Sequence, residues 1–388
     1  MEFTLSEKVN KLPPYLFVEI DKAKRKARSE GKDIIDLGIG DPDQGSPKEV
    51  IESLSEAIKN ALNHHYPLDE GIPDLRKRVS KWYKDRFGVM LDPDKEVLIL
   101  IGSKEGIAHM PFAFLNEGDV NLVPEPCYPP YNGGTILAGG IPYKMPLLEE
   151  NAFLPDLKSI KKDVLKRAKI LYINYPNNPT GAICSSGFFE DSVIFARKNN
   201  IMVAHDAAYS EITYDGYKAG SFLKVDGAMD VGVEFHSLSK TCNMCGWRIG
   251  FVCGNEKIIR GIAKVKSNID SGVFNAIQAS AITALNISEK HTEAMNKIYQ
   301  ERRDILVDGF NSLGWATPRP KATFYVWTRL PKSYKSSIEF AKLVLEKTGI
   351  VITPGVGFGA SGEGYVRMAL TVSKERTKEA VDRLRKML

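Results

Sequence analysis

The sequence has few cysteines, no long hydrophobic run and little net charge. Its five cysteines among 388 residues are an odd, sparse set, which argues against a disulfide framework. Cys242 and Cys245 have the spacing of half a zinc site, but no second pair completes it, so we expect no metal. No window approaches the roughly 18 uninterrupted apolar residues of a membrane span, and the first eight residues lack the apolar core of a signal peptide. These absences predict a cytoplasmic protein.

The charge of the chain argues against two classes of partner. The net charge of +5 is small for this length, and the lysines and arginines are scattered along the sequence. This pattern predicts neither a nucleic-acid nor a membrane partner. The hydrophobic content of 43% and the charged content of 26% are those of an ordinary globular protein. Because the length exceeds that of a usual single domain, we expect two domains.

Short apolar runs alternate with helical patterns through the middle of the chain. Each run ends in a polar or glycine-rich turn, and the alternation predicts an α/β fold with a largely parallel sheet. Ligands of such sheets bind at the carboxyl ends of the strands, so a site is expected at these turns. The runs occupy residues 97–101, 120–123, 170–173, 201–204 and 232–235.

Helical patterns flank these runs. Ser46-Pro47-Lys48-Glu49 has the form of a capping box, which predicts a helix from Ser46. A second helical region around 288–311 is followed by strand-like runs and a final helix from about Ser373. Chain ends often lie together, so the N-terminal arm is expected beside this C-terminal part. The expected domains are an N-terminal arm with part of the small domain (1–45), a large domain (46–285) and a small α+β domain (286–388).

Lys240 is the most informative residue. It ends the run Ser237-Leu238-Ser239-Lys240, and Arg248 follows within Gly246-Trp247-Arg248-Ile249-Gly250. A lysine at a strand end beside hydroxyls and a guanidinium suits a Schiff base with a phosphorylated aldehyde, of which pyridoxal phosphate (PLP) is the obvious candidate. Alone, this run would be interpreted as a surface lysine in a polar loop.

Three segments upstream strengthen the PLP hypothesis. Gly102-Ser103-Lys104-Glu105-Gly106 begins an expected helix, where free backbone N–H groups bind phosphate. The turn around Asn178, with two prolines and a glycine, would hold that amide toward a ring oxygen. Asp206 follows a strand and could pair with a pyridinium nitrogen. Taken singly, the first segment could be a helix start that binds nothing, the second a structural turn, and Asp206 a helix cap. Their occurrence together in one chain favours a single site.

With these motifs, the chain resembles the fold-type I, PLP-dependent aminotransferases of classes I and II over nearly its whole length. The resemblance rests on Asn178-Pro179-Thr180-Gly181, Asp206-Ala207-Ala208-Tyr209 and the Lys240 segment through Gly250. It implies a large domain with a mostly parallel central sheet, a smaller α+β domain, and a homodimer. The implied activity is transfer of an amino group between an amino acid and a 2-oxo acid.

The resemblance also implies a role for each matched residue. Lys240 would form the Schiff base and move the proton between substrate Cα and cofactor C4′, and Asp206 would hold the pyridine nitrogen. Arg367 would clamp the substrate α-carboxylate, and Tyr66 would reach the phosphate bound by the neighbouring subunit. The remaining cofactor contacts would be Tyr128 on the ring face, Asn178 and Tyr209 at the ring hydroxyl, and Ser103, Lys104, Ser237, Ser239 and Arg248 at the phosphate.

Within this family the chain resembles the LL-diaminopimelate aminotransferases, at residues 12–17, 36–42, 103–105 and 274–278. This implies LL-2,6-diaminopimelate as amine donor and 2-oxoglutarate as acceptor, in lysine biosynthesis. The same segments occur in alanine, aspartate and aromatic aminotransferases, which stay alternatives, as does broad specificity. The residues then implied at the substrate or cofactor are Tyr15, Gly40, Lys104, Tyr128, Asn178, Asn275 and Arg367.

Three other classes of protein fit the sequence less well. Gly38-Ile39-Gly40-Asp41-Pro42-Asp43 departs from the G-x-G-x-x-G pattern, which argues against a Rossmann dehydrogenase. A PLP lyase or decarboxylase is the enzymatic rival, since a protonated ring supports those reactions too. A regulator with an aminotransferase-like domain would need a DNA-binding module, for which the sequence leaves no room.

Overall fold

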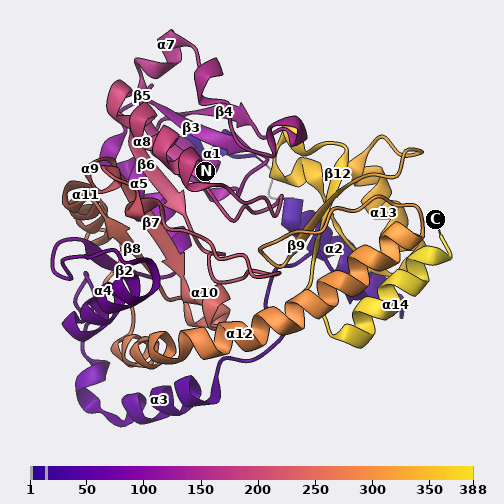
Figure 1. Ribbon diagram of the computed structural model, residues 1–388, viewed down its shortest axis with the longest axis horizontal. Helices are drawn as coiled ribbons and strands as arrows, with labels where there is room; N and C mark the ends of the chain where they lie inside the picture. The colour runs from indigo at the N-terminus through magenta and orange to yellow at the C-terminus, as the bar shows by residue number, and fades with distance from the viewer. Residues whose placement is uncertain (1–2, 14–15, 388) are drawn as a thin grey trace.

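The computed structural model describes residues 3–13 and 16–387, with residues 16–19 described by their backbone alone. Its centre is a seven-stranded sheet (Figure 1). Every pairing in the sheet is parallel except the two that β8 makes, with β2 and with β7. The predicted α/β fold with a mostly parallel sheet is therefore confirmed. The strands lie in the order β2 (Val97–Leu100), β8 (Gly250–Gly254), β7 (Gly232–Ser237), β6 (Met202–Asp206), β5 (Ala168–Ile173), β3 (Val120–Glu125) and β4 (Ile141–Pro146).

Helices cover both faces of this sheet, because successive side chains of a buried strand point to opposite faces and both faces are apolar. On one face, Trp82 and Tyr83 of α4 and Phe189 of α8 pack against strand residues such as Phe251. On the other face, helices α5, α6 and α11 pack against residues that include Phe235. The helices of the sheet are α4 (Pro73–Phe87), α5 (Ser103–Phe114), α6 (Pro130–Leu137), α7 (Lys162–Leu165), α8 (Ser186–Asn199), α9 (Ala228–Val231), α10 (Leu238–Thr241) and α11 (Glu256–Lys266).

A second apolar core surrounds a smaller sheet with the order β11-β12-β9. The N-terminal part of the chain joins it through β1, which pairs in parallel with β10. Helix α12 extends from beside α3 and α4 to α14, and so connects the two cores (Figure 1). The elements are α1 (Glu7–Asn10), α2 (Leu16–Ser29), β1 (Ile35–Asp36), α3 (Lys48–Lys59), α12 (Asn275–Ser312), β9 (Tyr325–Arg329), α13 (Ser337–Thr348), β10 (Ile350–Val351), β11 (Thr353–Pro354), β12 (Tyr365–Ala369) and α14 (Lys374–Arg385).

Two details of the expected helices differ from the structure. The predicted capping box at Ser46 is wrong: α3 begins at Lys48 after Pro47 and no side chain caps it. The Ser46 hydroxyl instead donates to the Asn243 carbonyl oxygen at 2.9 Å, which ties α3 to the Lys240 loop. The helix expected around residue 288 already begins at Asn275, so the domain boundary at residue 285, which stays a prediction, falls inside a continuous helix.

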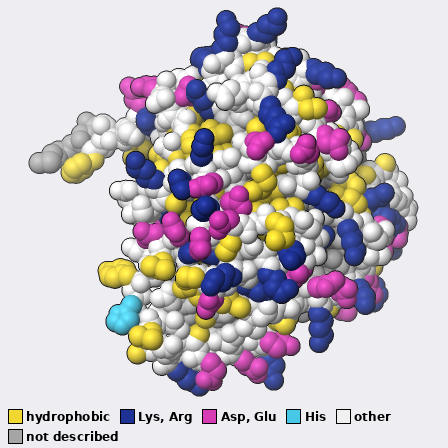
Figure 2. Space-filling model, turned by 60° about the vertical axis from the view of Figure 1, so that its left-hand side comes forward, with side chains coloured by type: hydrophobic (Ala, Val, Ile, Leu, Met, Phe, Trp, Pro, Cys, Tyr) yellow, Lys and Arg dark blue, Asp and Glu magenta, His cyan; other side chains and the backbone are white. Residues whose placement is uncertain are grey.

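The surface is polar and mixed in charge. Figure 2 shows basic and acidic side chains interspersed on one face, with hydrophobic side chains between them. Within residues 3–13 and 16–387, no helix is both long and apolar enough to cross a membrane.

Candidate active site

A cavity of about 400 Å³ lies where β5, β6 and β7 end. This is the position that the parallel strands predicted for a ligand. The cavity brings together twelve of the residues singled out in the sequence: Gly40, Ser103, Lys104, Tyr128, Asn178, Asp206, Tyr209, Ser237, Ser239, Lys240, Arg248 and Arg367.

Of the other singled-out residues, Tyr66 and Asn275 do not line the cavity. Tyr66 is 91% exposed. Asn275 lies beside it, and its side-chain amide donates to the His65 carbonyl oxygen at 3.4 Å. Tyr15 lies outside the described residues. The roles implied for these residues stay predictions.

Lys240 reaches the cavity from a short helix at the end of β7. Ser237 ends β7 and caps α10, because its hydroxyl oxygen accepts from the Ser239 N–H at 3.3 Å. The Lys240 ammonium then donates to the Gly40 carbonyl oxygen at 2.8 Å and lies 3.4 Å from the Cys245 sulfur. An amine is thus held at the cavity by groups that leave it chemically accessible as a nucleophile.

One end of the cavity is built to hold an anion. Ser103 is the first residue of α5, where backbone N–H groups and the helix dipole favour negative charge. Arg248 lies across this helix start, and its Nη1 donates to the Cys245 carbonyl oxygen at 2.7 Å. Gly102 has a φ of +76°, which favours glycine, and a Cβ added there would lie 2.5 Å from Arg248 Nη2. With the hydroxyls of Ser237 and Ser239, this end suits a phosphate.

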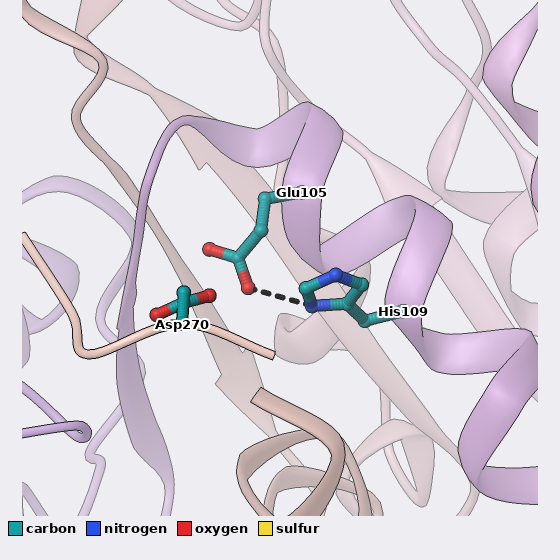
Figure 3. A group of neighbouring side chains, drawn as sticks. All are labelled: Glu105, His109 and Asp270. Atoms are coloured by element: carbon teal, nitrogen blue, oxygen red, sulfur yellow. Dashed lines mark ion pairs between the residues drawn. The ribbon is translucent and has the colours of Figure 1, made fainter. Parts of the chain in front are cut away.

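A half-buried ionic cluster fixes the turn that carries this helix start. Glu105, His109 and Asp270 place ligand-type atoms within 4.8 Å of one another (Figure 3). The ammonium of Lys266 forms ion pairs with two members of this cluster, at 3.2 Å from Glu105 Oε2 and 2.7 Å from Asp270 Oδ1. Glu105 also accepts from the Ile101 N–H at 2.7 Å. The cluster therefore anchors the residues just before Ser103 to the segment after α11.

Asp206 lies at the far end of β6, deep in the same cavity. Burial raises the pKa of its carboxyl group, while the Tyr131 hydroxyl, the Ala208 N–H and the charges of His205 and His236 oppose that rise. The Tyr131 hydroxyl donates to Asp206 Oδ2 at 2.7 Å, and the Ala208 N–H donates to Oδ1 at 3.2 Å. A buried carboxyl group of this kind gains most from a cationic ligand, which favours its ionised form.

Arg367 and Asn178 form one unit on the opposite wall. Arg367 donates to Asn178 Oδ1 at 2.9 Å and to the Gly38 carbonyl oxygen at 2.8 Å. Because a guanidinium only donates, Oδ1 faces Arg367, and the amide nitrogen is the donor end of Asn178. The guanidinium carbon lies 4.1 Å from the centre of the Tyr325 ring and 4.6 Å from that of Phe358. Cation–π contacts of this kind help to fix the orientation of the fork.

Tyr209 remains a proton donor at neutral pH. Burial raises the pKa of its phenol far above the ordinary value, Tyr325 raises it further, and Arg367 opposes the rise. The hydroxyls of Tyr209 and Tyr325 lie 3.0 Å apart. Tyr209 therefore offers an O–H group to an oxygen in the cavity.

Sequence reasoning missed four residues that support the site. Tyr131 and Tyr325 hold Asp206 and Tyr209, Phe358 stacks on Arg367, and the Asn174 amide donates to the Asp206 backbone carbonyl at 2.7 Å. None belongs to a motif. Their contribution comes from packing between segments distant in sequence, and only Tyr131, three residues after Tyr128, carried a local signal.

The residues of the cavity fit PLP as a whole. The Ser103 and Arg248 end suits its phosphate, the Asp206 carboxyl group suits its ring nitrogen, and the Lys240 amine suits its aldehyde. The close approach of the Arg248 guanidinium to the Gly102 backbone at the start of α5 is the structural observation that most directly supports this fit.

Comparison with known proteins gives a consistent result. The family model for aminotransferase class I and II matches residues 32–384. An LL-diaminopimelate aminotransferase of Moorella thermoacetica is 55% identical over 383 residues, which cover 99% of this chain and 98% of that protein. Substrate-bound BacF from Bacillus subtilis has a TM-score of 0.96 at 39% identity, over 100% of this chain and 98% of that one.

A mutant aspartate aminotransferase of Thermus thermophilus has a TM-score of 0.93 at 28% identity, over 100% of both chains. The fold expected from the motifs, that of fold-type I aminotransferases, is thereby confirmed along the whole described chain. Together with the family match, these likenesses leave one conclusion: this chain belongs to the class I and II aminotransferases and is a PLP-dependent enzyme of transamination.

Proposed function

We propose that the enzyme transfers an amino group from LL-2,6-diaminopimelate to 2-oxoglutarate, with tetrahydrodipicolinate as the acceptor in the reverse direction. The observation that carries this proposal is the degree of identity. The relative named for LL-diaminopimelate is 55% identical to this chain over nearly all of both proteins. The aspartate aminotransferase with the same fold is only 28% identical.

The site residues divide the chemical work. PLP, when bound, supplies the electron sink for the substrate Cα–H bond. Lys240 Nζ takes the proton from the substrate Cα, and its contact with the Gly40 carbonyl oxygen positions the amine beside the cavity. Asp206, as an anion, pairs with a protonated ring nitrogen, and Tyr209 and Asn178 donate to the ring oxygen. Ser103, the backbone N–H of Lys104, Ser237, Ser239 and Arg248 would hold the phosphate, and Tyr128 would pack on the ring face.

Arg367 binds the α-carboxylate of the substrate. Its guanidinium is already oriented by Asn178, Gly38 and the Tyr325 ring, so little side-chain entropy is lost when the carboxylate binds. A bidentate fork of this type also fixes the direction of the Cα–H bond, which selects transamination chemistry by geometry.

The remainder of the substrate must be matched by charged groups. LL-2,6-diaminopimelate carries a second ammonium and a second carboxylate, and a buried unpaired charge is costly. Asp41 and Lys104 both line the cavity. The neighbouring Gly40 lies between Lys240 and Tyr325, and its lack of a side chain lets the backbone pack closely against both. We assign Asp41 to the distal ammonium and Lys104 to the distal carboxylate, with Tyr15 from the N-terminal arm as a further contact.

The working unit is a homodimer in the cytoplasm. Around Tyr66 the chain exposes apolar side chains, including Leu62, Leu68 and Ile269, of which Leu62 is 71% exposed. The His64 and Phe274 rings lie 6.2 Å apart, which brings the two exposed segments together. A contiguous apolar patch of this kind marks an interface. Tyr66 and Asn275 would then complete the site of the partner. All five cysteines are free, as suits a reducing compartment.

A kinetic panel tests the substrate assignment. We expect kcat/KM for LL-2,6-diaminopimelate to exceed that for the meso isomer, alanine, aspartate and an aromatic amino acid. In Asp41→Asn, kcat/KM should fall for LL-2,6-diaminopimelate and change little for alanine, which has no distal ammonium. A wild-type kcat/KM for alanine or aspartate above that for LL-2,6-diaminopimelate would overturn the substrate assignment and leave the aminotransferase reaction intact.

A further inference from the structure

Behind the strand ends of the site lies a buried carboxylate that the reaction does not touch. Glu234 is on β7, has no exposed surface, and accepts five hydrogen bonds. Its Oε1 accepts from the hydroxyls of Tyr83 and Ser221, both at 2.9 Å, and its Oε2 accepts from the Phe222 N–H at 2.7 Å. The other two partners are ring nitrogens, His236 Nε2 at 3.0 Å and His205 Nδ1 at 2.9 Å.

His205 connects this carboxylate to the site. It is the residue directly before Asp206, and in the parallel sheet it is the register partner of Glu234 on one side and of Ile173 on the other. Its Nε2 lies 3.0 Å from the carbonyl oxygen of Tyr175 and 3.3 Å from the Tyr175 backbone nitrogen, just before the turn that holds Asn178. The imidazole therefore joins the ends of β5, β6 and β7.

We infer that Glu234 is a positioning residue for the reaction. Its carboxylate holds protons on His205 and His236, and through these rings it keeps Asp206 in place and ionised. This inference rests on the proposed role of Asp206 at the ring nitrogen.

The charge arrangement gives this network a direction. A carboxylate only accepts, so the ring nitrogens that face Glu234 carry protons. Although burial disfavours its charged form, hydrogen bonds and charge from His205 and His236 lower the pKa of Glu234, so it stays ionised. His205 directly precedes Asp206 on β6, whereas Glu234 is on the neighbouring strand, β7. The charges of His205 and His236 lower the pKa of Asp206.

The other titratable groups around Glu234 stay neutral. They come from α4, the segment before α8, and β8: Tyr83, Cys184 and Cys253. Burial raises the pKa of all three, and the charge of Glu234 raises each further. The two imidazoles are therefore the groups through which the Glu234 charge acts on the site between pH 6 and 8.5.

The effect of Glu234→Gln on cofactor binding has a definite sign. Without the carboxylate, the two rings lose its negative charge and its hydrogen bonds, and we expect the pKa of Asp206 to rise. Binding that depends on ionised Asp206 is present above that pKa and is lost as the pH falls through it. The loss should begin at a higher pH in the variant. For each unit by which the pKa of Asp206 rises, PLP binds about tenfold more weakly at pH values below the titration range of Asp206. Above that range the affinity does not change.

The experiment measures the PLP dissociation constant as a function of pH, together with the low-field imidazole N–H resonances of the holoenzyme. For Glu234→Gln we expect PLP to bind on the order of tenfold more weakly at pH 6 and at most about twofold more weakly at pH 8.5. The His205 and His236 N–H signals should move or vanish. Tyr83→Phe is the matched control: it removes one hydrogen bond from the same carboxylate and keeps the charge, so any weakening should be equal at both pH values.

The possible outcomes separate the hypotheses. If Glu234→Gln weakens binding equally at both pH values, as Tyr83→Phe does, Glu234 is merely structural and the inference fails. Should Glu234→Gln not fold, His236→Gln keeps a donor to Glu234 and removes the ring, and it should give the same pH-dependent weakening; a pH-independent ratio there overturns the inference. In Asp206→Asn the wild-type pH dependence should disappear. If it persists, the proposed role of Asp206 fails, whatever Glu234→Gln shows.

Discussion

Gly40→Ala introduces a methyl group where the structure has no room for one. The added Cβ would lie 1.9 Å from the Tyr325 hydroxyl oxygen and 2.6 Å from its Cζ. Tyr325 cannot move alone, because its ring stacks on Arg367 and its hydroxyl lies 3.0 Å from that of Tyr209. Overpacking of this kind costs about 1–3 kcal/mol. If the clash displaces Arg367 and Tyr209 and the whole of this energy is lost from the transition state, kcat/KM drops roughly 5- to 150-fold.

The assay is kcat/KM for the best substrate, measured beside the melting temperature. Gly45→Ala is the matched control, since a Cβ there meets nothing within 4 Å, and it should keep wild-type activity. The double variant Gly40→Ala with Tyr325→Phe removes the nearest clashing atom and should recover part of the loss, which is a coupling between neighbours. Full activity of Gly40→Ala, or no recovery in the double variant, would refute the account of this wall.

Three further predictions concern the proposed site roles. Asp206→Ala should lose roughly 10²-fold or more in kcat, because an unprotonated ring is a poor electron sink; Asp206→Glu should retain far more, and wild-type activity of the alanine variant would contradict the role. Arg367→Lys should raise KM for every amino acid about tenfold, since lysine keeps the charge and loses the fork; an unchanged KM would place the α-carboxylate elsewhere. Mixing inactive Tyr66→Ala with inactive Lys240→Ala should regenerate activity in hybrid dimers, and no recovery after demonstrated subunit exchange would argue against a shared site.

The sequence predicted the strands whose signal is local. The runs at 97–101 and 170–173 are continuous and apolar because both faces of those strands are buried. It did not predict β8, which is short and bounded by Gly250 and Gly254, or β4, which contains two prolines and lies at the edge of the sheet. In both, tertiary pairing overrides a weak local preference.

The same limit applies to the site. Lys240, Asp206 and Asn178 lie in motifs whose spacing reflects their chemistry, so they could be assigned to one site from the sequence alone. Tyr325 and Tyr131 act by where their side chains are packed, and no spacing encodes this. The capping box at Ser46 failed for a related reason, because the Ser46 hydroxyl is taken by Asn243, almost 200 residues away.

The central claim is that Lys240 carries the cofactor, and borohydride reduction followed by peptide mapping tests it most directly. The purified enzyme should be yellow, reduction should remove the imine absorbance, and the phosphopyridoxyl group should be found on the peptide that contains Lys240. Lys240→Ala should fold, retain some PLP without a covalent bond, and give no labelled peptide and no transamination. A label on any other lysine, or transamination by Lys240→Ala at the wild-type rate, would contradict the account.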